Sequence, residues 1–477
     1  MQLLMVFSSL SFLICFLPPT LIVYHLLPGG LKNIWLVITS IVFYAAGEPI
    51  FIFLLLLEIL WNWAAGIMIA RVQTKKRKKL VLVLGLLGDL GVLGLFKYSG
   101  FLVQSVNDLF GTLFLLPAFV LPIGISFYTF QEISYIVDVY RGEPVRKNPI
   151  EVALYLSFFP QLIAGPIVRY REIAPQLSNR RTDWSGVSDG FLRFCLGLCK
   201  KVLLADQLAA LVKLVYDVQQ LDVFCAPILG LAAIAYWLQI YFDFSGYSDM
   251  AIGLGAMFGF RLPENFHHPY LAGTATEFWR RWHITLSAWF RDYVYFPLGG
   301  SRGGRAKTIC NLLIVWALTG LWHGAGWTFL LWGLFWGTLL VLEKFLLRPE
   351  SRGKVFRRLY HVLIVLIMIL SWVPFRAQSV HAALQLLGRM ISPAAWVLSR
   401  AQWPALQLWW HEMWLYLIAG CALVFGLPQR LFACLVRGTE QPVWVDVLRL
   451  SALAACVCLS ISYLVSGSYS PFLYFQF

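Results

Sequence analysis

The chain has 477 residues, of which 59% are hydrophobic and only 13% are charged. An average soluble domain is about 45–50% apolar and about 25% charged, so this composition excludes an ordinary water-soluble protein. The net charge of +14 resides in basic clusters between long apolar runs. Such clusters are typical of the short loops that orient membrane spans. We therefore expect a polytopic membrane protein that contacts lipid and binds no nucleic acid.

The first quarter of the chain predicts conventional membrane helices. A retained first helix covers residues 1–27 and is broken by Pro18 and Pro19. Further spans are predicted by their apolar length at 31–47, 49–70, 80–96 and 109–130. The loop 71–79 carries six positive charges and no acidic residue, so we expect it on the cytoplasmic side.

The middle of the chain is less regular. Residues 155–166 are apolar but short and interrupted by Pro and Gly, which favours a re-entrant or interfacial element. Residues 190–216 predict a helix, and 226–241 form an apolar run that leads into two acids, Asp243 and Asp249. Acids in such a position are buried in protein or line water. Residues 277–292 are amphipathic and too charged to cross lipid, so we place them at the interface or along a cavity.

The run 308–347 is apolar and is interrupted by a glycine-rich segment, 320–326. Its two halves are short to marginal for spanning about 30 Å of hydrocarbon, and both flanking loops are basic. This pattern predicts a hairpin that returns to one side of the membrane, with its turn deep in the protein. Further spans are predicted at 356–375, 408–426 and 445–465. The fold class is therefore an all-α polytopic membrane protein, with residues 1–477 as a single integral-membrane domain.

The nine cysteines suggest neither a disulfide framework nor a metal site. Most lie inside apolar runs, where free cysteine behaves as a small hydrophobic residue. Cys195 and Cys199 are one helical turn apart, but no nearby histidine or carboxylate pair completes a ligand set. We predict no metal.

His323 is the strongest candidate for chemistry. It lies in the glycine-rich break of the predicted hairpin, with apolar sequence on both sides. An imidazole at membrane depth needs a polar partner or water and is a functional candidate for that reason. Neighbouring tryptophans exclude water and favour the neutral ring, which can accept a proton. The alternative is a histidine that packs between helices and bonds a backbone carbonyl.

His283 is the second candidate. It follows Arg280, Arg281 and Trp282, and Ser287 stands one turn later. Arginine pairs suit the recognition of phosphate or carboxylate groups. The alternative is a basic and aromatic belt at the membrane interface.

Five long motifs stand in order along the chain. They are Phe158-Phe-Pro-Gln-Leu-Ile-Ala-Gly-Pro166, Tyr241-Phe-Asp-Phe-Ser-Gly-Tyr-Ser-Asp249, Glu277-Phe-Trp-Arg-Arg-Trp-His283, Trp289-Phe-Arg-Asp-Tyr-Val-Tyr-Phe-Pro-Leu-Gly-Gly300 and Leu321-Trp-His-Gly-Ala-Gly-Trp327. Together they resemble the membrane-bound O-acyltransferase (MBOAT) family, in the branch of alginate O-acetylation membrane subunits. The resemblance runs in order along nearly the whole chain and is densest over about 155–340.

The resemblance implies a bundle of about 10–12 transmembrane helices with re-entrant segments and a central funnel. His323 corresponds to the family's central histidine and is assigned as the general base. His283 corresponds to a second polar position, which orients the acyl donor or the hydroxyl. The residues expected to line the substrate or donor site are Trp322, Trp279, Arg280, Arg281, Ser287, Asn265 and Asp243, the last with a structural role as its alternative.

The implied activity is transfer of an acetyl group from a cytosolic thioester for O-acetylation of an exported polysaccharide. The donor is acetyl-CoA or another acyl thioester, and no tightly bound cofactor is expected. The resemblance also implies a bacterial inner-membrane location and an extracytoplasmic SGNH-type acetylase partner. Two alternatives stay open. One is transfer of D-alanine or another acyl group from a carrier protein to a cell-envelope polymer, and the other is a secondary transporter or flippase with a polar site at the midplane.

Overall fold

The computed structural model describes residues 5–117, 119–217, 224–397, 402–427, 443–467 and Phe472. Within this part, the chain forms helices and no strand. Seven of the described helical segments are long and apolar enough to cross a membrane: α2 (Gly29–Gly47), α3 (Ile52–Arg71), α4 with α5 (Lys75–Phe110), α12 (Ala226–Met257), α16 with the turns after it (Trp327–Ser351), α17 (Lys354–Arg376) and α21 (Val443–Val465). The prediction of an all-α, multi-pass membrane protein is confirmed.

The described chain groups into two compact units, each assembled from several stretches of sequence. Unit 1 comprises Met1–Phe194, Tyr247–Glu264 and Ala288–Val294. Unit 2 comprises Cys195–Gly246, Asn265–Ser287 and Tyr295–Phe477. The expectation of a single domain over the whole chain stays a prediction.

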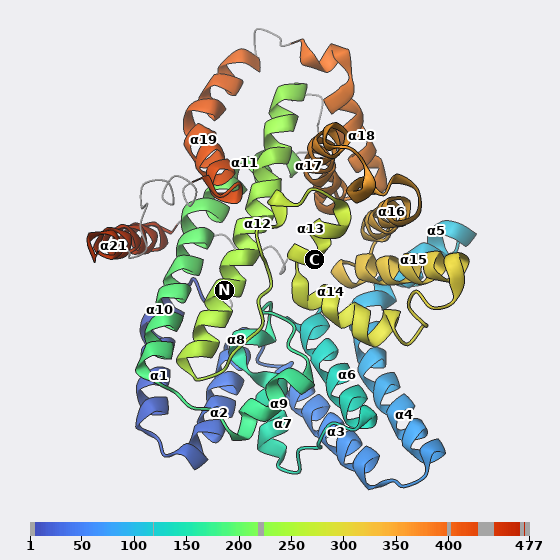
Figure 1. The fold of residues 1–477 in the computed structure, drawn as a ribbon, viewed down its shortest axis with the longest axis vertical. Coiled ribbons are helices and arrows are strands. Elements are labelled where there is room, and N and C mark those ends of the chain that lie inside the picture. The colour runs from blue at the N-terminus through green and yellow to red at the C-terminus, as the bar shows by residue number, and fades with distance from the viewer. Residues whose placement is uncertain are drawn as a thin grey trace. The chain divides into compact units, whose positions relative to one another are not determined.

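Unit 1 contains a bundle in which α3, α4 (Lys75–Leu93) and α6 (Ile125–Arg141) pack against one another (Figure 1). Gly66 of α3 allows a close approach, because a Cβ atom at this position would lie 2.4 Å from the hydroxyl oxygen of Tyr135 on α6. The shorter helices α7 (Pro149–Ser157) and α9 (Tyr170–Ser178) pack beside this bundle.

Two sequence predictions for unit 1 are wrong. The predicted span 109–130 is not a helix, because the described residues between Gly111 and Gly124 are irregular and α6 begins only at Ile125. Pro117 and Pro122 lie in this stretch, and each lacks the N–H that a helix interior uses. Pro18 and Pro19 do not interrupt the first helix either. They stand in the first turn of α1 (Leu17–Leu26), where proline is tolerated, directly after a π-helical turn at Ser11–Phe16.

The segment 155–166 is broken as expected, because α7 ends at Ser157 and the four-residue helix α8 (Phe159–Leu162) follows. The helix predicted at 190–216 is also found. It consists of α10 (Trp184–Cys199), a π-helical stretch at Lys200–Ala205 and α11 (Asp206–Tyr216).

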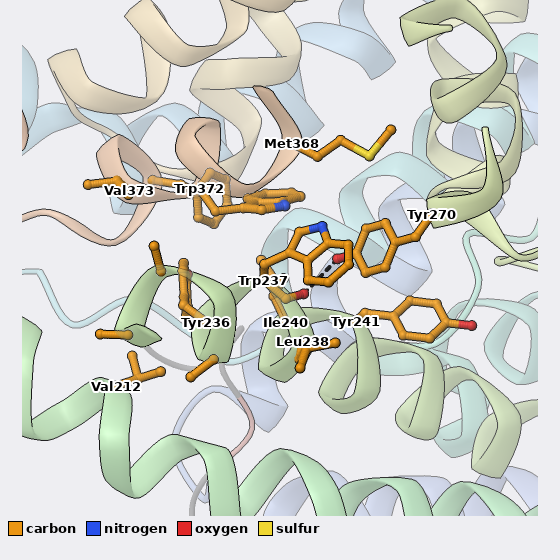
Figure 2. Packing of buried hydrophobic residues seen from close by; sticks show 14 of the residues in the cluster. Val212, Tyr236, Trp237, Leu238, Ile240, Tyr241, Tyr270, Met368, Trp372 and Val373 are labelled. Carbon is orange, nitrogen blue, oxygen red and sulfur yellow. Dashed lines mark hydrogen bonds between the residues drawn. The ribbon is translucent and has the colours of Figure 1, made fainter. Parts of the chain in front are cut away.

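Unit 2 has a core rich in aromatic side chains from α12, α17 and the segment before α13 (Ala275–Arg281). The rings of Trp237 and Tyr270 stack at 4.1 Å, and the Tyr270 hydroxyl donates to the carbonyl oxygen of Trp237 at 2.6 Å (Figure 2). Trp372 and Met368 of α17 belong to the same core. Unit 2 also contains α11, the start of α14 (Ile284–Phe290), α15 (Gly304–His323), α16 (Trp327–Leu342), α18 (Val380–Ile391), α19 (Gln402–Val424) and α21.

The predicted hairpin at 308–347 is confirmed as α15 and α16 (Trp327–Leu342), which lie side by side (Figure 1). A Cβ atom on Gly333 would lie 2.2 Å from the carbonyl oxygen of Trp316 and 3.0 Å from the Cα atom of Gly320. The two backbones are therefore in contact at a point where each helix has a glycine. Both arms were expected to be short to marginal for a span, and the second arm is longer than expected. Its helical structure runs to Leu347 and resumes at Pro349–Ser351, so the segment Trp327–Ser351 has 25 residues and is apolar enough to cross a membrane. Helices α17 and α21 confirm the predicted spans 356–375 and 445–465. The predicted span 408–426 is found as the helix α19, which is not among the described helices that are long and apolar enough to cross a membrane.

Candidate active site

The two candidate histidines lie close together in unit 2. His323 is the last residue of α15, and His283 lies in the break between α13 and α14. Their exposed fractions are 4% and 1%. The ring of Trp322 is 5.9 Å from the His283 ring and 5.0 Å from the His323 ring, and the two imidazoles interact electrostatically. The structure therefore brings together two histidines that belong to separate sequence motifs.

Helix α13, which leads to His283, is fixed at its first turn by two side chains. The hydroxyl of Thr274 accepts from the N–H of Glu277 at 3.0 Å. The carboxylate of Glu343, directly after α16, accepts from the N–H groups of Ala275 at 2.6 Å and Thr276 at 2.8 Å. A carboxylate at a helix N-terminus satisfies free donors and complements the helix dipole. Glu343 also accepts from the Tyr360 hydroxyl at 2.8 Å, which links α13 to α17.

The predicted amphipathic segment 277–292 is interrupted at His283, whose φ angle is +44°. Non-glycine residues rarely adopt this left-handed conformation, and such strain is found preferentially at functional sites. The neighbouring segment holds the break in place. The N–H of Ile284 donates to the carbonyl oxygen of Asn265 at 3.0 Å, and the N–H of His267 donates to that of Arg281 at 2.9 Å.

The side chain of Asn265 determines which nitrogen of His283 carries the proton. Its Oδ1 accepts from the hydroxyl of Thr285 at 2.9 Å and from the N–H of the same residue at 3.4 Å, so this atom is the amide oxygen. His283 Nδ1 lies 3.0 Å from the same oxygen and must donate to it. The lone pair therefore lies on Nε2, which is buried and has no hydrogen-bond partner among the described residues.

The surroundings of His283 favour the neutral imidazole. Burial holds its pKa well below the ordinary value, and the nearby His323 acts in the same direction. The ring of Phe244 meets it edge-to-face at 4.6 Å. His283 thus offers a hydrogen-bond acceptor in a dry, aromatic environment.

Aromatic rings also surround His323. Its ring is 5.3 Å from Trp332 and 5.2 Å from Phe375, both in edge-to-face geometry. In the described structure, the indole N–H groups of Trp279 and Trp332 are buried without a hydrogen-bond partner. A buried donor without an acceptor costs about 1–3 kcal/mol, so these groups are suited to bind the oxygen atoms of a substrate.

The other predicted lining residues differ in their surroundings. Trp279 is buried against Trp316 at 4.6 Å, and its carbonyl oxygen accepts from the Ser287 hydroxyl at 3.3 Å. Arg281 pairs with Glu277 at 2.5 Å and is half-buried, whereas Arg280 is exposed.

Asp243 lies in a buried ion-pair triad. It is 2.6 Å from the ammonium group of Lys201, which also pairs with Asp206 at 2.8 Å. These contacts favour the structural role that the sequence left open for Asp243. Sequence reasoning missed Lys201 and Glu343, although Glu343 is an acid at the end of an apolar run and the same rule singled out Asp243.

Comparisons with known proteins match one family over the middle of the chain and several relatives over almost its whole length. The family model described as the membrane-bound O-acyltransferase family matches residues 144–349. The chain is 41% identical to a Pseudomonas putida protein named "Probable alginate O-acetylase AlgI", over 99% of this chain and 100% of the relative. It is 40% identical to the protein of the same name from Azotobacter vinelandii, over 99% and 100%. It is 33% identical to a Helicobacter pylori protein named peptidoglycan O-acetyltransferase, over 99% and 98%.

Proposed function

The chain belongs to the membrane-bound O-acyltransferase family and is a membrane-bound O-acyltransferase, and on this premise we propose that it moves an acetyl group from a thioester to a hydroxyl for O-acetylation of an exported polysaccharide. Relatives that cover almost the whole chain are named for the acetylation of alginate or peptidoglycan, which are both glycans. Membership of an enzyme family also favours acyl transfer over the transporter that the sequence left open.

The observation that carries the mechanism is the pair of buried imidazoles that both lie close to the Trp322 ring, at 5.9 Å and 5.0 Å. His323 acts as the general base and removes the proton of the attacking hydroxyl. The hydroxyl oxygen then bonds to the thioester carbonyl carbon, the carbon–sulfur bond breaks, and the proton passes to the leaving thiolate. A positioned base typically contributes about 10²–10⁴-fold to such a step.

His283 positions the substrate and does not remove a proton. Because Asn265 holds the proton on Nδ1, Nε2 can only accept. It accepts from an amide N–H of the donor or from a hydroxyl of the acceptor, and so fixes the distance between the reacting atoms. The buried indole N–H of Trp332, beside His323, is suited to donate to the carbonyl oxygen on which negative charge develops.

The donor is acetyl-CoA or an acetyl group borne on a carrier protein. Acyl thioesters form in the cytosol, whereas exported polysaccharides are modified outside, so a membrane enzyme is needed to connect the two. We place the protein in the bacterial inner membrane with the loop 71–79 on the cytoplasmic side. An SGNH-type acetylase outside the membrane completes the transfer to the polymer.

The test compares His323→Ala with His411→Ala, which removes an exposed histidine on α19 and serves as the control. We expect the first variant to lower the acetyl content of the secreted polymer by about 10²–10⁴-fold at equal protein level, and the second to leave it unchanged. Unchanged acetylation in His323→Ala would overturn the assignment of the base.

Purified protein identifies the donor. It is supplied separately with acetyl-CoA, with an acetylated carrier protein and with a D-alanylated carrier protein. We expect turnover with an acetyl thioester. Turnover with the D-alanylated carrier and with neither acetyl donor would instead identify the protein as a D-alanyl transferase.

A further inference from the structure

Three acidic side chains lie inside the α3–α4–α6 bundle of unit 1, away from the chemistry considered so far. They are Glu58 on α3, Asp89 on α4 and Glu132 on α6, with exposed fractions of 4%, 1% and 0%. Asp89 follows the last lysine of the basic loop by ten residues, or about 15 Å along the helix. This is half of the roughly 30 Å thickness of a bilayer's hydrocarbon core.

The packing of the three helices places Asp89 and Glu132 at one level, with Glu58 one helical turn away on α3. Both outer helices approach α6 closely at a glycine. A Cβ atom on Gly85 of α4 would lie 3.0 Å from Ile136, and one on Gly66 of α3 would lie 2.4 Å from the neighbouring Tyr135. One helical turn further along the bundle are Asn62 on α3, Asp89 on α4 and Glu132 on α6. The Asn62 amide nitrogen donates to Asp89 Oδ1 at 3.0 Å, and Glu132 interacts electrostatically with both Glu58 and Asp89.

The cluster has no basic partner among the ion pairs of the described residues. The other titratable groups that face it are also acidic or phenolic. They are Tyr44 and Glu48 near the end of α2, and Tyr128 on α6. The nearest lysine that follows on the same run of helix is Lys97, eight residues beyond Asp89. Its ammonium group donates to the Ser126 hydroxyl at 3.0 Å, and none of the ion pairs above joins it to the three acids.

The cluster contains more hydrogen-bond acceptors than donors. The Tyr128 hydroxyl is the donor next to the Glu58 carboxylate. Both carboxyl oxygens of Glu132, Asp89 Oδ2 and Asn62 Oδ1 are buried and lack a hydrogen-bond partner among the described residues. Ionised carboxylates only accept hydrogen bonds, so they cannot satisfy one another. Burying three neighbouring negative charges without a counter-charge is also far more costly than neutralising them.

We propose that Glu58, Asp89 and Glu132 form a proton-binding site within the membrane-spanning part of unit 1, which holds at least two protons at neutral pH. Each proton turns an acceptor into an O–H donor, which a neighbouring carboxylate or Asn62 Oδ1 accepts. A metal cation is the other possible source of positive charge. The described residues contain no group of three His, Cys, Asp or Glu side chains arranged to hold one, so we assign the positive charge to protons. Ionisable groups at membrane depth commonly form such proton sites.

Infrared spectroscopy of the full-length purified protein tests the proposal, because protonated carboxyl groups have a carbonyl-stretching band that carboxylates lack. We expect Glu58→Gln, Asp89→Asn and Glu132→Gln to fold, because an amide resembles a neutral carboxyl group, and the triple variant to lose the intensity of at least two protonated groups. The matched control is Asp249→Asn, which removes a carboxylate paired with Arg193 at 3.0 Å and leaves the band unchanged.

Two results would overturn the proposal. One is a triple variant that folds and has the same carboxyl band as the parent protein. The other is a parent band that is bleached by Na⁺ but not by a bulky organic cation at constant pH, which would identify a metal-cation site instead. Because the readout is spectroscopic, it does not depend on the acetyl donor or on the proposed base.

Discussion

Replacing Asn265 with alanine tests whether the orientation of His283 is needed for transfer. The Asn265 oxygen accepts from His283 Nδ1 at 3.0 Å and from the Thr285 hydroxyl at 2.9 Å. Without it, two buried donors lose their acceptor, at about 1–3 kcal/mol each. We therefore expect the free energy of unfolding to fall by about 2–6 kcal/mol, which thermal denaturation of the purified protein measures.

The same change acts on the reaction. In Asn265→Ala the proton of His283 is free to move to Nε2, and the ring is free to turn, so the acceptor is no longer held towards the substrate. Loss of a residue that orients a functional side chain typically costs about 10–100-fold. We expect a reduction of this size in the acetyl-transfer rate of the folded fraction, smaller than the loss in His323→Ala.

Asn265→Asp is the matched control, because a carboxylate keeps the acceptor for Nδ1. Its negative charge favours protonated His283 and raises the pKa of the imidazole. Protonated His283 cannot accept a hydrogen bond, so the acid limb of the pH–rate profile should move to higher pH while activity recovers above it. A parent-like rate in folded Asn265→Ala would refute the positioning role of His283, and so would a pH profile that does not move in Asn265→Asp.

Three further substitutions test the packing around the site and within unit 1. Gly333→Ala places a methyl group 2.2 Å from a backbone oxygen of α15, so we expect loss of folded protein in detergent, whereas Gly91→Ala on α4, where nothing lies within 4 Å, should behave like the parent. Glu343→Ala leaves the first N–H groups of α13 without their acceptor. We expect a lower melting temperature, equivalent to about 1–3 kcal/mol for each buried donor that is left unpaired. Asp292 is partly buried, which raises its pKa, but its hydrogen bond and ion pair with Arg291 outweigh this and hold the pKa below the ordinary value. Its contribution to stability is therefore present above the unfolded pKa of about 3.9 and is lost as the pH falls through the folded value, and Asp292→Asn should weaken this acid destabilisation in melting curves recorded against pH.

Local sequence patterns were sufficient to predict the hairpin and the place of His323 at its break. A long apolar run with a glycine-rich interruption has few alternatives to two packed helices, and a histidine in that interruption has a defined place. The prediction of a span at 109–130 failed because hydropathy alone does not register how prolines disrupt a helix. Helix α6 was missed for the converse reason, since it buries Gln131 and Glu132, which a search for apolar runs penalises.

The support for His283 could not be predicted from local sequence. Glu343 reaches the start of α13 across 68 residues of sequence, and Asn265 reaches His283 across 18. Neither separation corresponds to a periodic pattern, because these contacts depend on how α16 and the segment before α13 pack in unit 2. The sequence identified Asn265 as a lining residue, which stays a prediction, and the structure adds that its oxygen accepts from His283 Nδ1.

The aromatic shell around the histidines has a chemical reason in acyl transfer. A base that activates a hydroxyl group activates water equally well, and water would waste the donor by hydrolysing its thioester. Rings within 5.0–5.3 Å of His323 and the low exposure of both imidazoles exclude bulk water from the space around the proposed base. The same burial disfavours the charged form of His283, so its acceptor is available without a separate device to lower its pKa. Exclusion of water and a neutral acceptor are thus two consequences of one packing arrangement, which explains why tryptophans, and not smaller apolar residues, flank these histidines.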